Sequence, residues 1–258
     1  MSSLQLKNIR TDGYALLHMI NKVNVYIIHV KSQEERKKHM LRQMNLHACL
    51  SGYRFMTEGD MDTISPEEHQ RLFSGELSVM SPAVSCAYKH ISCYRDMLQQ
   101  NVPYALIFED DIFLESYFCD ELHLIVKEIE EKKYKNFIVS LEDSSLTYVK
   151  GSEKKPDTRL YPATKGRMAG AYLLDRVACQ KLMETTEQKT CHLPIDWFHN
   201  HCADKGILQM FWAHPTLATQ GSLNGALGSL IDQKKTGNIR QLLFAMSRCY
   251  KKLLYRLR

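Results

Sequence analysis

The sequence predicts an α/β protein in which helices flank a largely parallel, doubly wound sheet and a basic amphipathic helix ends the chain. Short apolar runs alternate with longer segments of helical period, which is typical of β-α-β order. One of these runs, residues 104–108, ends abruptly in three consecutive carboxylates. From Ile239 to Leu257, apolar residues recur every three or four positions, which predicts the terminal helix.

The first elements follow directly from residue pattern. Residues 23–30 are apolar enough for a buried first strand. A helix is expected from Ser32 to about Leu46, because Ser32 and Glu35 have the spacing of a capping box. Residues 53–56 are expected to form a short second strand.

Two serine-proline pairs predict further helix starts. Ser65 and Ser81 each precede a proline, which suits the first helical position while the serine caps the helix. The second helix extends toward Gln100 and leads into the strand that ends in the acids. The remaining elements are expected as a helix at about 118–132, a strand at 136–141, a mobile loop or lid at 142–167, a strand at 168–174, a helix to about 184 and a helix capped by residues 194–198.

The chain divides into an N-terminal extension (residues 1–22), one folded domain (23–233) and a basic tail (234–258). No run of about 18 apolar residues occurs, and residues 1–22 lack the pattern of a secretory signal, so we expect a cytoplasmic protein. The eight cysteines are scattered without a Cys-x-x-Cys pair. They are therefore expected to be buried, reduced thiols and not a disulfide framework.

The net charge of +5 is unevenly distributed along the chain. From Lys234 onward there are eight Lys or Arg and no acids, so residues 1–233 are slightly acidic. A basic amphipathic helix suits the headgroup plane of an anionic membrane, with the apolar face buried and the cations on lipid phosphates. The alternative is a helix that docks on the core of the protein. We do not expect nucleic-acid binding, because no recognised nucleic-acid module accompanies the tail.

The acidic triplet Glu109-Asp110-Asp111 is the strongest candidate site. It follows a buried strand, and the carboxyl ends of strands are where open sheets bind ligands. Adjacent carboxylates repel one another unless they share a cation, and oxygen ligands suit Mn²⁺ or Mg²⁺. In an extended segment Glu109 and Asp111 would point to the same side. A solvated acidic turn is the alternative interpretation.

Several motifs together resemble a known family. They are the strand VYIIHV followed by Arg36, a helix from Ser81 to Arg95 that contains Cys86 and His90, the block LIFEDD, the segment 170–174, and Pro194-Ile195-Asp196-Trp197. In this order and spacing, across residues 23–220, they are similar to glycosyltransferase family 25. That family holds bacterial lipooligosaccharide and lipopolysaccharide galactosyltransferases and relatives of collagen galactosyltransferase. The chain departs from the family pattern at His29-Val30 and at residues 85–90.

The resemblance implies a glycosyltransferase A-type, Rossmann-like fold for the domain, a nucleotide-sugar donor, a divalent metal and inversion at the anomeric carbon. We expect a hexose, galactose first, to pass from a UDP-sugar to a lipooligosaccharide, lipopolysaccharide or other surface-glycan acceptor. The enzyme would then lie on the inner face of the cytoplasmic membrane. Glucosyl transfer, transfer to protein hydroxylysine, or a catalytically silent binding module are the alternatives.

Roles follow for individual residues. Asp111 is the expected direct metal ligand, with Glu109 and His214 as further candidates. The general base is expected to be Asp196, which lies beside aromatic residues suited to stacking on a sugar, or else Asp143. The residues expected to bind the nucleotide-sugar are His29, Arg36, Lys89, His90, Glu109 and Asp110.

A second group of soft ligands, Cys191-His192 and His199-Asn200-His201-Cys202, also invites a metal hypothesis. Its spacings match no standard zinc finger, and transfer of a sugar does not need a catalytic zinc. We therefore do not expect zinc at these residues.

Overall fold

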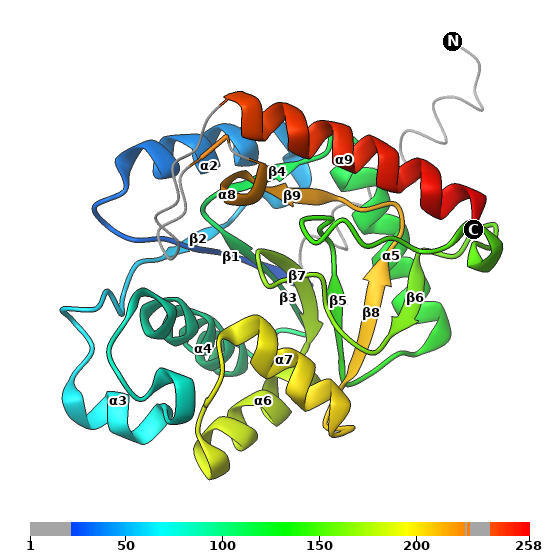
Figure 1. Ribbon diagram of the computed structural model, residues 1–258. Coiled ribbons are helices and arrows are strands. Elements are labelled where there is room, and N and C mark those ends of the chain that lie inside the picture. The colour runs from blue at the N-terminus through cyan, green and yellow to red at the C-terminus, as the bar shows by residue number, and fades with distance from the viewer. Residues whose placement is uncertain (1–21, 225, 228–237) are drawn as a thin grey trace, which may run out of the picture.

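The computed structural model describes residues 22–224, 226–227 and 238–258 (Figure 1). The expected N-terminal extension, apart from Lys22, and the first residues of the basic tail lie outside the described residues. The central sheet has seven strands in the order β2-β1-β3-β7-β5-β8-β6. These strands are β1 (Val23–Ile28), β2 (Arg54–Met56), β3 (Tyr104–Glu109), β5 (Phe137–Ser140), β6 (Leu160–Ala163), β7 (Ala171–Asp175) and β8 (Gln209–Ala213).

The predicted α/β class with a mostly parallel sheet is confirmed. β1 is parallel to both β2 and β3, and β5 is parallel to β8. β7 runs antiparallel between β3 and β5, and β6 is antiparallel to β8 at the sheet edge. A separate two-stranded sheet joins β4 (Ile112–Leu114) to β9 (Ala218–Gln220) directly after the acidic triplet.

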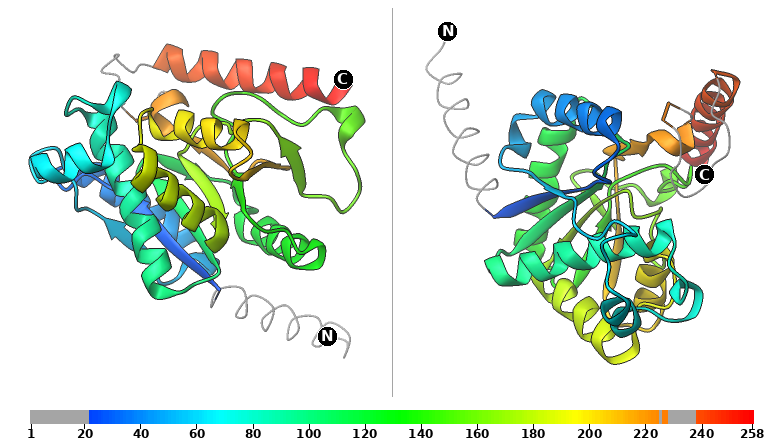
Figure 2. Two further views of the ribbon diagram at one scale, coloured as in Figure 1. Left: turned by 90° about the horizontal axis from the view of Figure 1, so that it is seen from below. Right: turned by 90° about the vertical axis from the view of Figure 1, so that its left-hand side faces the viewer.

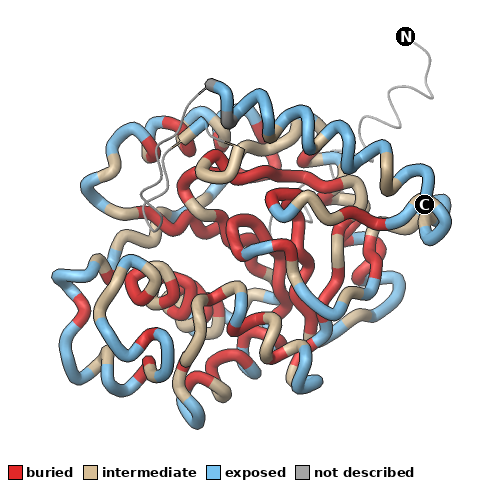
Figure 3. The backbone as a smooth tube through the Cα atoms, viewed as in Figure 1, coloured by how far each residue is buried: buried red, intermediate tan, exposed pale blue. Residues whose placement is uncertain are grey.

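Helices cover both faces of the central sheet (Figure 2). They are α2 (Glu34–Leu46), α3 (Pro66–Leu72), α4 (Pro82–Gln100), α5 (Phe118–Lys132), α6 (Arg176–Lys189), α7 (Ile195–Asp204), the short α8 (Gly221–Asn224) and α9 (Asn238–Leu257). α3, α4, α6 and α7 pack on one face and α2 and α5 on the other. The central strands β1, β3, β5 and β7 are therefore almost wholly buried, as Figure 3 shows in red, which explains their continuous apolar composition.

Local capping rules predicted most of the helix starts. The side chains of Ser65 and Ser81 accept hydrogen bonds from the backbone N–H of Glu68 and Val84, so both predicted caps are confirmed. The capping box at Ser32 is wrong, because α2 begins two residues later with Gln33 at the cap position and no side-chain cap bond. Glu34 and Glu35 in the first turn remain favourable for the helix dipole.

The region expected to be a mobile loop or lid, residues 142–167, is more ordered than its composition indicates. It contains β6, which completes the sheet edge against β8, and a short 3₁₀ turn at Gly151–Glu153. Pro162 lies within β6, where a proline is tolerated because an edge strand needs no hydrogen-bond donor on its outer side. Tertiary pairing with β8 thus creates a strand that the sequence did not reveal.

The expectation that all cysteines are reduced is also wrong for two of them. Cys49 and Cys119 are disulfide-bonded, although 70 positions separate them in the sequence. Packing of the segment after α2 against the start of α5 places their Cα atoms 5.7 Å apart, within the normal range for a disulfide. The free cysteines are Cys86, Cys93, Cys179, Cys191, Cys202 and Cys249.

The C-terminal helix α9 docks on the protein through its polar side. Arg248 Nε lies 2.6 Å from Asp143 Oδ2, and Arg248 Nη2 lies 2.5 Å from Glu115 Oε1. Lys252 Nζ is 3.3 Å from the same oxygen of Asp143. Asp143 is fully buried, so these cations neutralise a charge that would otherwise be costly.

The apolar side of α9 faces away from the protein. Ile239, Leu242, Leu243, Met246, Tyr250, Leu253 and Leu257 are each more than half exposed. The amphipathic pattern is therefore confirmed, but two of the cations expected to meet lipid phosphates are used internally. No described helix is both long and apolar enough to cross a bilayer.

We predict that Arg248→Gln destabilises the fold by about 2–4 kcal/mol at neutral pH, because it removes the cation that lies closer to the buried carboxylate of Asp143 than Lys252 does. Urea unfolding followed by circular dichroism measures this difference. Lys251→Gln, which removes an exposed cation from the same helix, is the matched control and should change stability by less than about 0.5 kcal/mol.

The effect of Arg248→Gln should depend on pH. Burial raises the pKa of Asp143, but the charge of Arg248 and hydrogen bonds from Thr219 and Arg248 outweigh it, so the pKa lies below its ordinary value. A carboxyl with a lowered pKa stabilises the fold above the unfolded pKa of about 4 and loses this contribution at lower pH. A difference between variant and wild type that did not shrink below about pH 4 would contradict the ion pair.

Candidate functional site

The acidic triplet lies where β3 ends and the β4–β9 sheet begins. Glu109 is the last residue of β3, and β4 starts at Ile112. The backbone N–H of Gly221 donates to Asp111 O at 2.7 Å, and that of Ser222 donates to Asp111 Oδ2 at 2.9 Å. The start of α8 therefore fixes Asp111. Asp110 and Asp111 are buried, so the alternative of a solvated acidic turn is wrong for these two residues.

Asp110 is the charge-paired member of the triplet. Its Oδ2 lies 2.7 Å from His29 Nδ1, and its Oδ1 lies 2.5 Å from Arg36 Nη1. His29, at the end of β1, and Arg36, in the first turn of α2, were expected to bind donor. In this structure both hold Asp110, which ties β1 and α2 to the end of β3, and their contact with a donor stays a prediction.

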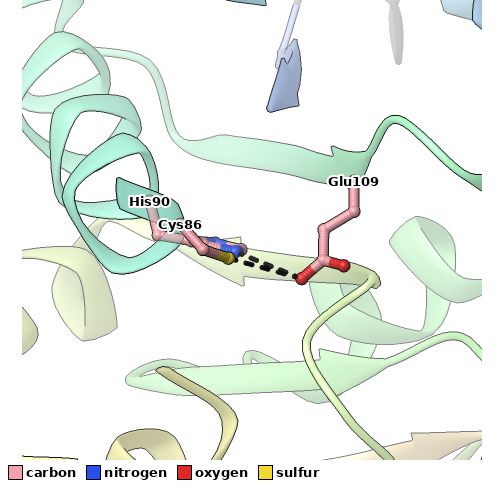
Figure 4. A group of neighbouring side chains, drawn as sticks. All are labelled: Cys86, His90 and Glu109. Carbon is pink, nitrogen blue, oxygen red and sulfur yellow. Dashed lines mark hydrogen bonds and ion pairs between the residues drawn. The ribbon is translucent and has the colours of Figure 1, made fainter. Parts of the chain in front are cut away.

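Glu109 points the other way, toward α4, and contacts neutral groups. Its Oε1 is 3.8 Å from Cys86 Sγ and 3.7 Å from His90 Nε2, as Figure 4 shows. Its Oε2 accepts a hydrogen bond of 3.1 Å from Gln220 Nε2. Burial and then the charge of Asp110 raise the pKa of Glu109 to about 7.

His90 ends a buried chain of hydrogen bonds. Its Nδ1 is 2.7 Å from the hydroxyl of Tyr172, which is 2.8 Å from the hydroxyl of Tyr94, which is 2.7 Å from His199 Nε2. Burial lowers the pKa of His90 to about 3, so its ring is neutral at physiological pH. The Nε2 atom that faces Glu109 is buried and has no hydrogen-bond partner.

Asp111 offers the clearest oxygen ligand for a hard cation. Its Oδ1 is buried without a hydrogen-bond partner, and Arg36 Nη2 lies 3.9 Å from the other carboxylate oxygen. Burial, followed by the charge of Glu109, raises the pKa of Asp111. An unpartnered carboxylate oxygen of raised pKa fits a divalent cation, which would supply the missing charge.

Asp196 lies in the first turn of α7 and is close enough to Glu109 to interact with its charge. Burial raises the pKa of Asp196; the amide of Trp197 opposes this shift and the charge of Glu109 adds to it. Burial, then the charges of Glu109 and Asp196, raise the pKa of the Cys86 thiol. The three side chains are therefore close enough to influence one another electrostatically. Trp197 beside Asp196 is 64 % exposed and presents an apolar surface to solvent.

Asp143, the second expected base, is not available for proton transfer. Besides Arg248 and Lys252, its oxygens accept hydrogen bonds from Tyr148 at 3.1 Å and from Thr219. A fully buried carboxylate with a lowered pKa and this many donors is a poor proton acceptor. The structure assigns Asp143 to the docking of α9.

Two further expected residues lie elsewhere. His214 follows β8, three strands away from β3 in the sheet, and its ring packs against Tyr161. It therefore does not reach the acidic triplet. Lys89 is buried, with Nζ 2.7 Å from Asp60 Oδ1 and 3.3 Å from Glu58 O, and it secures the segment before α3.

Cys86 and Gln220 lie in the site, but neither received a role from the sequence. Cys86 is four positions before His90, which was expected to bind the nucleotide-sugar, and this spacing places both on the same helix face and could have indicated a shared site. Gln220 gave no such signal, because only the β4–β9 pairing brings it to Glu109. A Cβ atom at Gly170 would lie 2.2 Å from Gln220 Nε2, so a larger residue there would displace this side chain from its place beside Glu109.

The soft ligands around Cys191 and Cys202 are engaged in other contacts. Within the described ranges, the one group of three potential ligand atoms lying within 4.8 Å of one another is Cys86, His90 and Glu109. Cys191 Sγ donates to Leu193 O, and the rings of His192 and His201 contact each other edge-on. The expectation of no zinc there stays a prediction that nothing in the geometry opposes.

Comparison with solved structures returns distant likenesses. Mannose-1-phosphate geranyltransferase from Thermus thermophilus is 8 % identical with a TM-score of 0.39, covering 76 % of this chain and 75 % of that one. A CMP:2-keto-3-deoxy-manno-octonic acid synthetase is 10 % identical with a TM-score of 0.38, covering 87 % of this chain and 99 % of that one. Likenesses of this size support no conclusion about activity.

Sequence comparison is more informative. A Haemophilus influenzae protein named "Putative glycosyltransferase" is 23 % identical over 203 residues, which cover 71 % of this chain. The alignment spans 64 % of the length of that relative. Residues 22–199 match the model of glycosyltransferase family 25 (LPS biosynthesis protein), and because this match spans more than half of the chain, the protein belongs to that family.

Proposed function

We propose that the protein is an inverting, metal-dependent hexosyltransferase that moves a sugar, galactose first, from a UDP-sugar to a lipopolysaccharide or lipooligosaccharide acceptor. The observation that carries this proposal is the separation of roles at the end of β3. Asp110 is neutralised by His29 and Arg36, whereas Asp111 Oδ1 lacks a partner and Glu109 contacts uncharged groups. Family membership supports the transferase reaction itself.

A divalent cation such as Mn²⁺ or Mg²⁺ would be held by Asp111, with Glu109 near its water shell or the donor ribose. When bound, it would supply positive charge for the leaving diphosphate as a Lewis acid. The protein keeps Asp111 in place through the backbone N–H groups of Gly221 and Ser222. Little rearrangement of this carboxylate is therefore needed when negative charge develops on the leaving diphosphate.

Asp196 is the proposed general base. In the reaction, the acceptor oxygen forms the new bond to the anomeric carbon while the bond from that carbon to the diphosphate breaks. The proton of the acceptor hydroxyl passes to the Asp196 carboxylate. A raised pKa suits this role because a stronger base accepts the proton more readily, and exposed Trp197 offers a surface on which an acceptor sugar can stack.

Calorimetric titration of UDP with and without Mn²⁺ tests the proposed donor and metal together. UDP affinity should rise in the presence of Mn²⁺, because a cation held by Asp111 would offset the negative charge of the diphosphate. Equal UDP affinity in both conditions would contradict metal dependence, and absence of UDP binding in both would favour a silent binding module.

We predict that Asp111→Asn raises the activation free energy of sugar transfer by at least about 3 kcal/mol while the protein stays folded. The amide oxygen of asparagine can still accept the Ser222 N–H and has nearly the same volume. Steady-state transfer from UDP-galactose measures the loss.

Asp110→Asn is the contrasting variant. It is expected to lower thermal stability, because Arg36 and His29 lose their buried partner. More than a tenth of wild-type activity in Asp111→Asn would refute the metal ligand.

We further predict that Asp196→Asn lowers kcat by about 10²- to 10⁴-fold and leaves UDP affinity near that of wild type, since a base acts on the acceptor and not on the nucleotide. Asp143→Asn should instead lower thermal stability, because it weakens the docking of α9. If the two variants showed the reverse pattern, the assignment of the base would be wrong.

We also propose that α9 places the enzyme on an anionic membrane surface beside a lipid-linked acceptor. Its exposed apolar side is flanked by Lys251, Arg256 and Arg258, which remain exposed after Arg248 and Lys252 have docked. Such a surface combines buried apolar area with attraction to lipid headgroups, worth about 1 kcal/mol per cation.

For this helix we predict that Leu242→Ser combined with Leu253→Ser weakens sedimentation with anionic liposomes while stability and transfer to a soluble acceptor sugar stay near wild type. Both side chains are more than half exposed, so little internal packing is lost. A truncated chain is unsuitable here, because it would uncover Asp143. Unchanged liposome binding in the double variant would contradict the membrane role.

A further inference from the structure

Cys86, His90 and Glu109 form a compact group of chemically different ligands. Cys86 and His90 lie one turn apart on α4, and both side chains point at the same carboxylate oxygen at the end of β3 (Figure 4). Three potential ligand atoms, one from each residue, lie within 4.8 Å of one another.

The spacing of these atoms is close to that of a tetrahedral metal site. With metal–ligand distances of 2.0–2.3 Å, neighbouring ligand atoms around zinc lie roughly 3.5 Å apart. Glu109 Oε1 is 3.7 Å from His90 Nε2 and 3.8 Å from Cys86 Sγ. Shifts of a few tenths of an ångström would therefore bring these two distances to tetrahedral values, and the third, between Cys86 Sγ and His90 Nε2, is no longer than 4.8 Å.

The atoms behind this group are arranged as the outer shell of a metal site usually is. The other ring nitrogen of His90 is hydrogen-bonded to Tyr172, and the other oxygen of Glu109 is hydrogen-bonded to Gln220. Outer partners of this kind orient metal ligands and fix the histidine tautomer. When His90 Nδ1 donates to Tyr172, Nε2 presents a lone pair toward Glu109, where it has no partner.

A lone pair facing a carboxylate oxygen is unfavourable unless a cation or a proton lies between them. The 3.7 Å separation is too long for a hydrogen bond, so a proton on Nε2 would not satisfy both groups well. A metal ion would. The side chain of Glu109 is 24 % exposed and Cys86 is partly exposed, which leaves a path for an ion and room for a fourth ligand.

We propose that Cys86 Sγ, His90 Nε2 and Glu109 Oε1 bind one Zn²⁺ ion, with water or another small ligand in the fourth position. A thiolate and an imidazole select zinc over the hard cations that an all-oxygen site at Asp111 would take. The site is thus distinct in chemistry from the proposed donor metal, although both involve Glu109.

Cobalt titration of the chelator-treated full-length protein tests the site directly. Co²⁺ substitutes for zinc, and a cysteine ligand produces a thiolate-to-cobalt charge-transfer absorption in the near ultraviolet. Wild type should show this absorption, saturating at one equivalent and bleached by one equivalent of Zn²⁺. Cys86→Ser should lose it, whereas Cys202→Ser, which removes a buried thiol outside the group, should keep it.

Absence of the absorption from wild type, or its survival in Cys86→Ser, would overturn the proposal. Tyr172→Phe gives a second and milder test, because it removes the partner of His90 Nδ1 without removing a ligand. It should keep the absorption and weaken zinc binding by about 10- to 100-fold. Unchanged zinc affinity in a folded Tyr172→Phe protein would count against His90 as a ligand.

These readouts need neither donor nor acceptor, so they stand apart from the transferase proposal. Titrating UDP and Mn²⁺ onto zinc-loaded protein then links the two. Because Glu109 would serve both sites, zinc should weaken UDP binding, and Cys86→Ser should remove this effect. Zinc binding without any effect on UDP would leave the zinc site intact and refute the role of Glu109 in donor binding.

Discussion

The structure depends on how the protein accommodates carboxylates crowded at one end of its sheet. The group comprises Glu109, Asp110, Asp111, Glu142, Asp143 and Asp196. Like charges in a poorly solvated region repel, so each acid needs a cation, hydrogen-bond donors or a proton.

Asp110 and Asp143 have cations, and Glu142 accepts hydrogen bonds from the backbone N–H of Gly170 and Ala171 and from the Ser144 hydroxyl. Burial raises the pKa of Glu142 despite these bonds, and it also raises the pKa of Glu109, Asp111 and Asp196, of which Asp111 keeps an unpartnered oxygen. This division separates acids that hold the fold from acids that can act on a ligand.

The same requirement explains why the C-terminal helix is part of the domain. Asp143 follows β5 and is fully buried, and its cations come from a helix more than a hundred residues later. A basic amphipathic helix that binds membranes would normally keep its cations in solvent. Here α9 uses Arg248 and Lys252 inward and leaves its apolar side outward, so docking on the core and exposure to a membrane are compatible. The two interpretations that the sequence left open are therefore not exclusive alternatives.

Local signals predicted the fold well and the site less well. Serine-proline pairs, apolar runs and helical period located most helices and strands, because these depend on nearby residues. They missed β6, whose existence depends on pairing with β8, and the Cys49–Cys119 disulfide, whose halves meet only after α5 packs. In the site, the triplet was a candidate because it follows a buried strand, and Asp196 was a candidate because aromatic residues lie beside it. The pairing of Asp110 with Arg36 and of Asp143 with Arg248 depends on long-range packing, and so the sequence could not separate structural acids from functional ones.

Glu109 shows why such a separation needs geometry. By sequence it is one of three adjacent acids, yet its neighbours point its carboxylate toward a thiol and an imidazole while Asp110 and Asp111 turn to Arg36 and to α8. Gln220 holds one oxygen and leaves the other facing Cys86 and His90. A cation near Asp111 and a cation between Cys86 and His90 would draw this carboxylate in different directions, and burial makes either interaction strong. The identity of the cation that reaches Glu109 first would then decide whether this carboxylate serves the donor or a zinc ion.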